Sequence, residues 1–262
     1  MISSRRINIT IIILVILIGS LLWLPGFAQE SFGDKRSRRE LFPIDPKTYL
    51  MGRFRPDTTR DFVLLPAELS GGRRTYLRTS VAEAVGRLIQ AALKDSVPLW
   101  VLSATRSYDH QRAIWNSKFS GARTSMGRNL AQEFADSTER CLALLEYSSA
   151  PGTSRHHWGT DVDLNSTDPA YWRSGEGVVV MKWLQQHAGR YGFIMAYPPD
   201  REHGYRYEPW HWSYQPLSRP LLRNYYRRLI TPSDLDGFLG AEVVRRLPWW
   251  EWYVNGVDEG LR

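Results

Sequence analysis

The chain contains a single cysteine, Cys141, among 262 residues. An internal disulfide is therefore excluded, and the hydrophobic core must stabilise the fold by itself. The apolar neighbours Leu142, Leu144 and Leu145 predict that Cys141 is a buried thiol in a helix and not a nucleophile.

The sequence also lacks any nucleic-acid recognition motif, although its formal net charge is +7. Its basic residues are scattered, so we do not expect nucleic acid as a partner. Removal of Arg5 and Arg6 with an N-terminal signal would leave 7 − 2 = +5. A basic exported protein would favour anionic surfaces such as cell wall or phospholipid.

Only one long apolar run is present, from Ile9 to Leu24, and it follows Arg5 and Arg6. Small residues stand at positions −3 and −1 of a cut after Ala28. The run is slightly long for a signal peptide and just short of a usual membrane span. We therefore expect residues 1–28 to be a signal peptide or a membrane anchor, which places the rest of the chain in the periplasm or cell envelope.

No internal repeat and no regular alternation of strands and helices occur along the chain, which favours an α+β fold with a central antiparallel sheet and flanking helices. Composition predicts a linker and irregular lead-in over residues 29–75, then one domain with a C-terminal helical extension over residues 76–262. Hydrophobic spacing predicts helices near residues 81–94, 136–145, 178–188, 217–229 and 233–247. It predicts strands near residues 98–102, 158–164, 192–197 and 205–214.

Two polar clusters carry the candidate chemistry. In the first, Asp161 and Asp163 alternate along a predicted strand and so share a face, with His156 just before them. A histidine near two aspartates is more often a hydrogen-bonded structural group than a metal ligand. The second cluster, with His211, favours the interpretation as a metal ligand. His156, Asp163 and His211 together would form a two-histidine, one-carboxylate site for one zinc ion.

Glu208 lies three residues before His211. On a regular strand the two would face opposite ways, so a bend is needed, and Pro209 favours one. Glu208 would then be a free base beside the metal. The common His-Glu-x-x-His motif of zinc proteases is absent.

These residues match a family pattern. Ser-x-His-x-x-Gly-x-x-x-Asp from Ser154, followed by Glu-x-Trp-His from Glu208, resembles the VanY-type D-alanyl-D-alanine carboxypeptidases. They are zinc peptidases that share a fold with lysostaphin and the hedgehog signalling domain. The resemblance covers roughly residues 95–216 and includes Arg106-Ser107-Tyr108 with Gln111.

The resemblance implies that His156, Asp163 and His211 bind zinc and that Glu208 is the general base. It also implies that Arg106 binds substrate with help from Ser154 and Gln111. A guanidinium can hold a terminal carboxylate or stabilise a developing oxyanion. The implied reaction is removal of the C-terminal D-alanine from peptidoglycan stem peptides. We also expect the protein to be a monomer.

One departure is Asp161, where the family usually has alanine. On the face shared with Asp163, it would orient a ligand from behind or alter the metal preference. His157, next to His156, introduces a register ambiguity, which the strict motif spacing resolves in favour of His156.

Three other functions remain open at this stage. A serine hydrolase is disfavoured because His156 stands where the nucleophile elbow needs glycine. A non-catalytic cell-wall-binding module would not need Glu208. A zinc endopeptidase of the same fold would cut inside peptides, whereas Arg106 favours recognition of a free C-terminus.

Overall fold

A computed structural model describes residues 40–262. Within them, no helix combines the length and hydrophobicity needed to cross a membrane. The apolar run at residues 9–24, expected to be a signal peptide or an anchor, lies outside the described residues.

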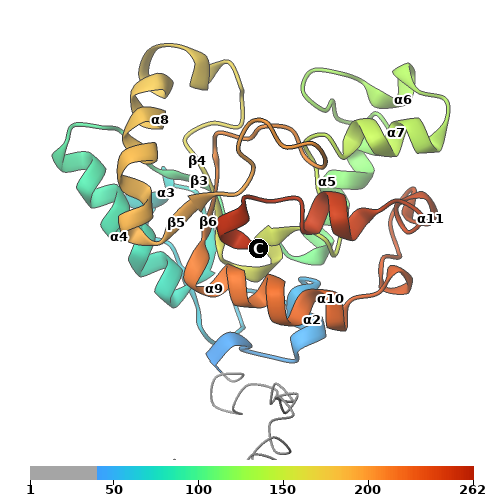
Figure 1. The fold of residues 1–262 in the computed structure, drawn as a ribbon, viewed down its shortest axis with the longest axis horizontal. Coiled ribbons are helices and arrows are strands. Elements are labelled where there is room, and N and C mark those ends of the chain that lie inside the picture. Colours follow the sequence, from blue (N-terminus) through green and yellow to red (C-terminus); the bar gives the residue numbers. More distant parts are fainter. Residues whose placement is uncertain (1–39) are drawn as a thin grey trace, which may run out of the picture. The chain divides into compact units, whose positions relative to one another are not determined.

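The centre of the fold is a four-stranded antiparallel sheet in the order β3-β4-β6-β5 (Figure 1). Its strands are β3 (Val101–Ser103), β4 (Asp161–Leu164), β5 (Phe193–Met195) and β6 (His211–Tyr214). A separate antiparallel pair joins β1 (Phe62–Leu64) to β2 (Tyr76–Arg78). The predicted α+β class with a central antiparallel sheet is confirmed.

Helices surround this sheet; in Figure 1, α4 and α8 lie to its left and α5, α7 and α11 to its right. The longer helices are α4 (Thr79–Lys94), α5 (Tyr108–Phe119), α7 (Ser137–Leu144) and α8 (Gly175–His187). The shorter ones are α2 (Pro46–Leu50), α3 (Ala67–Ser70), α6 (Leu130–Glu133), α9 (Gln215–Pro220), α10 (Arg227–Leu229) and α11 (Ala241–Val244). Short 3-10 turns include η1 (Arg155–Trp158), η2 (Tyr171–Arg173), η3 (Ala188–Tyr191), η5 (Pro232–Asp234) and η7 (Glu259–Leu261). Wider π-helical turns form η4 (Leu221–Tyr226) and η6 (Trp250–Val254).

The sheet separates an apolar face from a polar one. Val162 and Leu164 of β4 and Trp212 of β6 belong to a core cluster with the buried faces of α4 and α8. Because side chains alternate along a strand, Asp161, Asp163 and His211 point to the opposite face. Strand pairing sets Asp163 directly across from His211. Sheet register therefore brings together residues that lie 48 positions apart in the sequence.

Residues 40–75 correct the expectation of a linker there. They contain α2, β1 and α3, and Tyr49, Leu50 and Met51 are buried in the second core cluster. The segment lacks periodicity because its elements are short, but its apolar residues are still removed from water.

Several predicted elements are shorter than expected, including the strands at 98–102 and 158–164, which begin only at Val101 and Asp161. The predicted strand at 205–214 is a strand only from His211, because Pro209 and Trp210 form a turn that the His211 N–H closes onto the Glu208 carbonyl at 3.2 Å. The predicted helix at 233–247 is helical only as η5 and α11, since Gly237 and Gly240 between them have φ of 75° and 76°.

Candidate metal centre and active site

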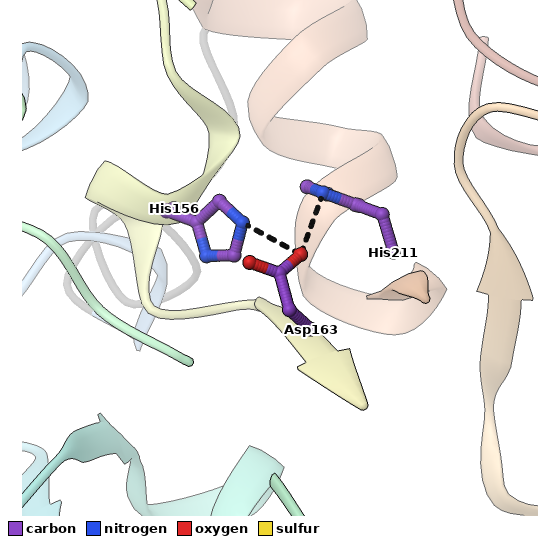
Figure 2. Close-up of side chains that lie close together, drawn as sticks. All are labelled: His156, Asp163 and His211. Atoms are coloured by element: carbon purple, nitrogen blue, oxygen red, sulfur yellow. Dashed lines mark ion pairs between the residues drawn. The ribbon is translucent and has the colours of Figure 1, made fainter. Parts of the chain in front are cut away.

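Three side chains converge on the polar face of the sheet. One ligand atom from each of His156, Asp163 and His211 lies within 4.8 Å of the others, and all three residues are buried. Asp163 Oδ1 is 3.3 Å from His156 Nε2 and 3.3 Å from His211 Nδ1 (Figure 2). These are the three residues that the sequence predicts as ligands.

Local structure positions each of these three residues. His156 lies on η1, which ends at Gly159 with φ of 66°, a left-handed conformation that favours glycine. The chain then enters β4, which carries Asp163. His211 is the first residue of β6, directly after the turn at Pro209.

Hydrogen bonds on the outer side of each imidazole leave the inner nitrogen free to bind a metal. His156 Nδ1 lies 2.8 Å from the Ala104 carbonyl, so it carries the proton and Nε2 keeps its lone pair. His211 Nε2 lies 3.0 Å from Asp161 Oδ1, which leaves Nδ1 facing Asp163. Within the described chain, the buried atoms His156 Nε2 and Asp163 Oδ1 have no hydrogen-bond partner. Two imidazole nitrogens and a carboxylate oxygen, buried and aimed at one point, fit a zinc ion.

Burial and neighbouring charges shift the pKa values of the candidate ligands. Burial alone would raise the pKa of Asp163, but His156 and His211 together with Arg106 hold it well below its usual value. Burial and then the charge of Arg106 lower the pKa of His156 to about 4. At neutral pH, Asp163 is therefore an anion and His156 is neutral, which are the forms that bind a metal. Burial would lower the pKa of His211, but its hydrogen bonds to Asp161 and Asp163 raise it to about 9, so metal binding would displace the proton on Nδ1.

Behind His211 lies a buried ion pair. Asp161 Oδ1 accepts from Arg155 Nε at 3.0 Å as well as from His211, and both Arg155 and Asp161 are almost completely buried. Arg155 also donates to Ser213 Oγ at 2.6 Å, and Thr160 Oγ1 donates to Asp161 Oδ2 at 2.5 Å. Asp161 thus contacts the outer nitrogen of a candidate ligand and does not itself join the candidate metal cluster.

Sequence reasoning missed Arg155. The signal that could have revealed it is Asp161, because a carboxylate buried on the inner face of a strand needs a cationic partner. Burial would raise the pKa of Asp161, but the Arg155 charge and then the His211 hydrogen bond hold it well below its usual value.

Glu208 is buried beside this cluster. Its Oε2 lies 3.6 Å from His211 Nδ1, and the turn at Pro209 puts both side chains on one side of the chain. Burial raises the pKa of Glu208 to about 7, although the charge of His211 opposes this shift. A carboxyl group with such a pKa can both take up and release a proton near neutral pH.

Arg106 is held against the cluster by two acceptors. Its guanidinium donates to Asp163 Oδ2 at 2.9 Å and to Gln111 Oε1 at 3.1 Å. Gln111 in turn donates to the Ser149 carbonyl at 2.7 Å. Gln111 therefore positions Arg106, and its amide oxygen is already used.

A cavity of about 400 Å³ opens onto the metal cluster. Arg106, Glu208 and the three predicted ligands line it. Gln111 and Ser154, for which the resemblance implies substrate contact, are buried and are not among its lining residues. The Ser154 hydroxyl is buried and has no hydrogen-bond partner within residues 40–262.

His157 points away from the cluster. Its Nδ1 lies 2.7 Å from the Arg106 carbonyl, and its Nε2 accepts from the Gly152 N–H at 3.1 Å. The two neighbouring histidines of η1 thus have different contacts. His156 faces the candidate metal site, whereas His157 connects the Arg106 loop to the turn at Gly152 through hydrogen bonds.

Comparison with known proteins agrees with this geometry. The family model described as VanY, D-alanyl-D-alanine carboxypeptidase, matches residues 74–217, more than half of the chain. The chain belongs to the VanY family. The family resemblance read from the two motifs is confirmed, and both motifs lie inside the matched range.

Individual relatives of this family are moderately similar. YodJ of Bacillus subtilis is 30% identical over 182 residues, which cover 65% of this chain and 58% of YodJ. A D-alanyl-D-alanine carboxypeptidase of Enterococcus faecalis is 32% identical over 149 residues, covering 56% of this chain and 50% of the relative. A solved structure of VanYB in complex with D-alanine-D-alanine is 26% identical, covers 60% of this chain and 86% of its own, and has a TM-score of 0.46. The chain spans about half the length of the curated VanY-family relatives that it matches.

Proposed function

We propose that this protein is a zinc-dependent carboxypeptidase that removes the C-terminal D-alanine from peptidoglycan stem peptides. The observation that carries the proposal is the buried convergence of His156, Asp163 and His211, with unpartnered metal-binding atoms, in the same cavity as Glu208. Membership of the VanY family supports the substrate class.

In this proposal, His156 Nε2, His211 Nδ1 and a carboxylate oxygen of Asp163 hold one zinc ion. When bound, zinc supplies a Lewis acid that polarises the scissile carbonyl and makes water more acidic. Glu208 accepts a proton from the attacking water and passes it to the leaving amine. Its pKa of about 7 suits both steps.

Arg106 has the charge and position to bind an anion near the reacting carbonyl. One of its terminal nitrogens is bonded to Asp163, and its buried Nε has no hydrogen-bond partner in the described chain. The guanidinium either holds the terminal carboxylate of the substrate or stabilises the negative charge that develops on the carbonyl oxygen.

The decisive experiment is mass spectrometry of zinc-loaded protein incubated with a stem pentapeptide that ends in D-Ala-D-Ala. We expect the wild type to release one alanine and Glu208→Gln to lose activity by at least about 100-fold, as expected for a general base. Both proteins should bind one zinc per chain, because Glu208 is not a ligand. An intact pentapeptide with zinc bound would contradict the proposal, and an internal cut would identify an endopeptidase.

We also propose that residues 1–28 direct export, so that the domain meets its substrate in the periplasm or cell envelope. N-terminal sequencing of protein from the envelope fraction tests this. A chain that starts at Gln29 indicates a cleaved signal, and an intact N-terminus in the membrane fraction indicates an anchor. Recovery of the protein only from the cytoplasm would contradict export.

A further inference from the structure

One wall of the active-site cavity is a face of helix α5 whose far end carries a cation. His110, Ile114 and Lys118 are spaced four residues apart and all line the cavity. Side chains at this spacing share one face of a helix. Lys118 stands eight residues beyond His110, which corresponds to about 12 Å along the helix axis. The cavity thus extends from the metal cluster along α5 to Lys118.

Lys118 is a cation with no carboxylate at ion-pair distance among the described residues, although the charge of Glu208 raises its pKa slightly against the effect of burial. Its ammonium group donates to the Ser148 hydroxyl at 2.7 Å, and none of the ion pairs among residues 40–262 includes it. Burial, followed by the charges of Arg106 and Arg123, lowers the pKa of Lys118 to about 8. The side chain is therefore still mostly protonated at neutral pH, and a charge this buried is stabilised by an anion.

The cavity as a whole has more positive than negative charge. Three cationic side chains line it: Arg106, Lys118 and Arg123. The lining carboxylates are Asp163 and Glu208. With a divalent ion at the metal cluster, the formal excess is three positive charges. The single C-terminal carboxylate of a substrate offsets one of them.

We propose that Lys118, assisted by the exposed Arg123, forms a subsite for a second carboxylate of the substrate, on the N-terminal side of the scissile bond. The inference rests on the proposed carboxypeptidase function. In such an enzyme only one residue lies beyond the scissile bond, so the rest of the peptide must extend along the remaining length of the cavity. Each extended residue spans about 3.3–3.6 Å, so Lys118 is reached within a few residues.

This subsite selects among stem peptides by charge. A stem with diaminopimelate at its third position carries a side-chain carboxylate that Lys118 can bind. A stem with lysine at that position offers only an ammonium group, which Lys118 and Arg123 repel. The protein should therefore prefer stems with the additional carboxylate.

The test compares two pentapeptides that are identical except for diaminopimelate or lysine at the third position. For the zinc-loaded wild type, we expect kcat/KM to be about tenfold higher or more with diaminopimelate, since a hydrogen bond to a charged group is worth about 1.5–3 kcal/mol. Lys118→Met should reduce this ratio to about one through a higher KM for the diaminopimelate peptide, and Lys118→Glu should favour the lysine peptide.

Arg112→Met is the matched control. Arg112 is an exposed cation on the same helix, but it lies outside this cavity and pairs with Asp109 at 3.0 Å. This variant should keep the wild-type ratio. Equal kcat/KM for both peptides in the wild type, or an equal loss on both peptides in Lys118→Met, would overturn the subsite.

A binding measurement separates this inference from the proposed function. If the wild type cleaves neither peptide, the proposed function fails. Calorimetry with the two peptides and zinc-loaded protein then tests the subsite by itself. Tighter binding of the diaminopimelate peptide that disappears in Lys118→Met would support the subsite. Equal affinities would overturn it.

Discussion

At the scale of single residues, the least expected feature is the buried pair of Arg155 and Asp161 behind the proposed ligand His211. Burial of two charges is costly, and the pair is maintained by hydrogen bonds to His211, Ser213 and Thr160. The carboxylate fixes which nitrogen of His211 carries the proton and hence which one faces the metal. Asp161 thus directly contacts a proposed metal ligand.

We expect Asp161→Ala to weaken zinc binding about 10–100-fold, because the outer nitrogen of His211 loses its acceptor. It should also lower the free energy of unfolding by about 3–5 kcal/mol, since Arg155 is left buried without a counter-charge. Chelator competition measures the first effect and urea unfolding the second.

The double variant Arg155→Met/Asp161→Ala separates the two effects. It removes both charges, so stability should recover in part while zinc affinity stays low. A zinc affinity in Asp161→Ala equal to that of the wild type would contradict the role of Asp161.

Cys141 is predicted to be unreactive in the folded protein. It is fully buried on α7, its thiol donates to the Gly240 carbonyl at 3.7 Å, and burial raises its pKa to about 12. Since thiolate is the reactive form, only about one thiol in 10,000 is ionised at pH 8. A thiol reagent at pH 8 should label urea-unfolded protein rapidly and native protein only at the rate of unfolding. The pKa of a cysteine thiol in the unfolded chain is about 8.5. Above that pH, ionisation of the thiol in the unfolded chain therefore lowers the free energy of unfolding.

At the scale of elements, the turn between η1 and β4 determines how His156 meets Asp163. Gly159 has φ of 66° there, and a Cβ on it would lie 2.5 Å from Phe62 Cε1. Both backbone conformation and space therefore require glycine at this position.

Gly127 offers a matched control for this turn, because it has φ of 79° but a Cβ there would meet no atom within 4 Å. We expect Gly127→Ala to cost about 1–2 kcal/mol from backbone strain alone. Gly159→Ala should cost about 1–3 kcal/mol more because Phe62 must move, and it should also weaken zinc binding. Urea unfolding of both variants checks this, and equal costs would show that the contact with Phe62 is unimportant.

At the scale of the whole molecule, residues 40–75 are part of the domain that holds the active site. The Tyr108 N–H at the start of α5 donates to the Gly52 carbonyl at 2.6 Å. The Tyr49 hydroxyl donates to the Trp158 carbonyl in η1. This segment therefore supports both the Arg106 loop and the turn that carries His156.

We expect a chain that begins at residue 76 to fold poorly. It loses the burial of Tyr49, Leu50 and Met51, each worth about 1.5–3 kcal/mol, which is comparable to the whole stability of a domain. Thermal unfolding followed by circular dichroism should show a cooperative transition for residues 40–262 and none for residues 76–262. Equal unfolding transitions for the two proteins would instead support the domain boundary at residue 75 that composition predicts.

The sequence by itself was sufficient for the fold class, the VanY family and the three residues that converge at the candidate metal site. Each depends on short-range chemistry: Asp161 and Asp163 alternate along one strand, and His156 and His211 stand at fixed motif positions. The bend that Glu208 needs was also predictable, because Pro209 cannot continue a ladder of hydrogen bonds.

Only the tertiary structure decided what surrounds those residues. The pairing of Arg155 with Asp161, the use of Gln111 to position Arg106, and the place of Lys118 in the cavity depend on contacts between segments distant in the chain. The packing of residues 40–75 likewise appears only when their few apolar side chains meet a core formed by later elements. Burial and long-range pairing arise from the whole fold, whereas strand alternation and turn chemistry are properties of neighbouring residues.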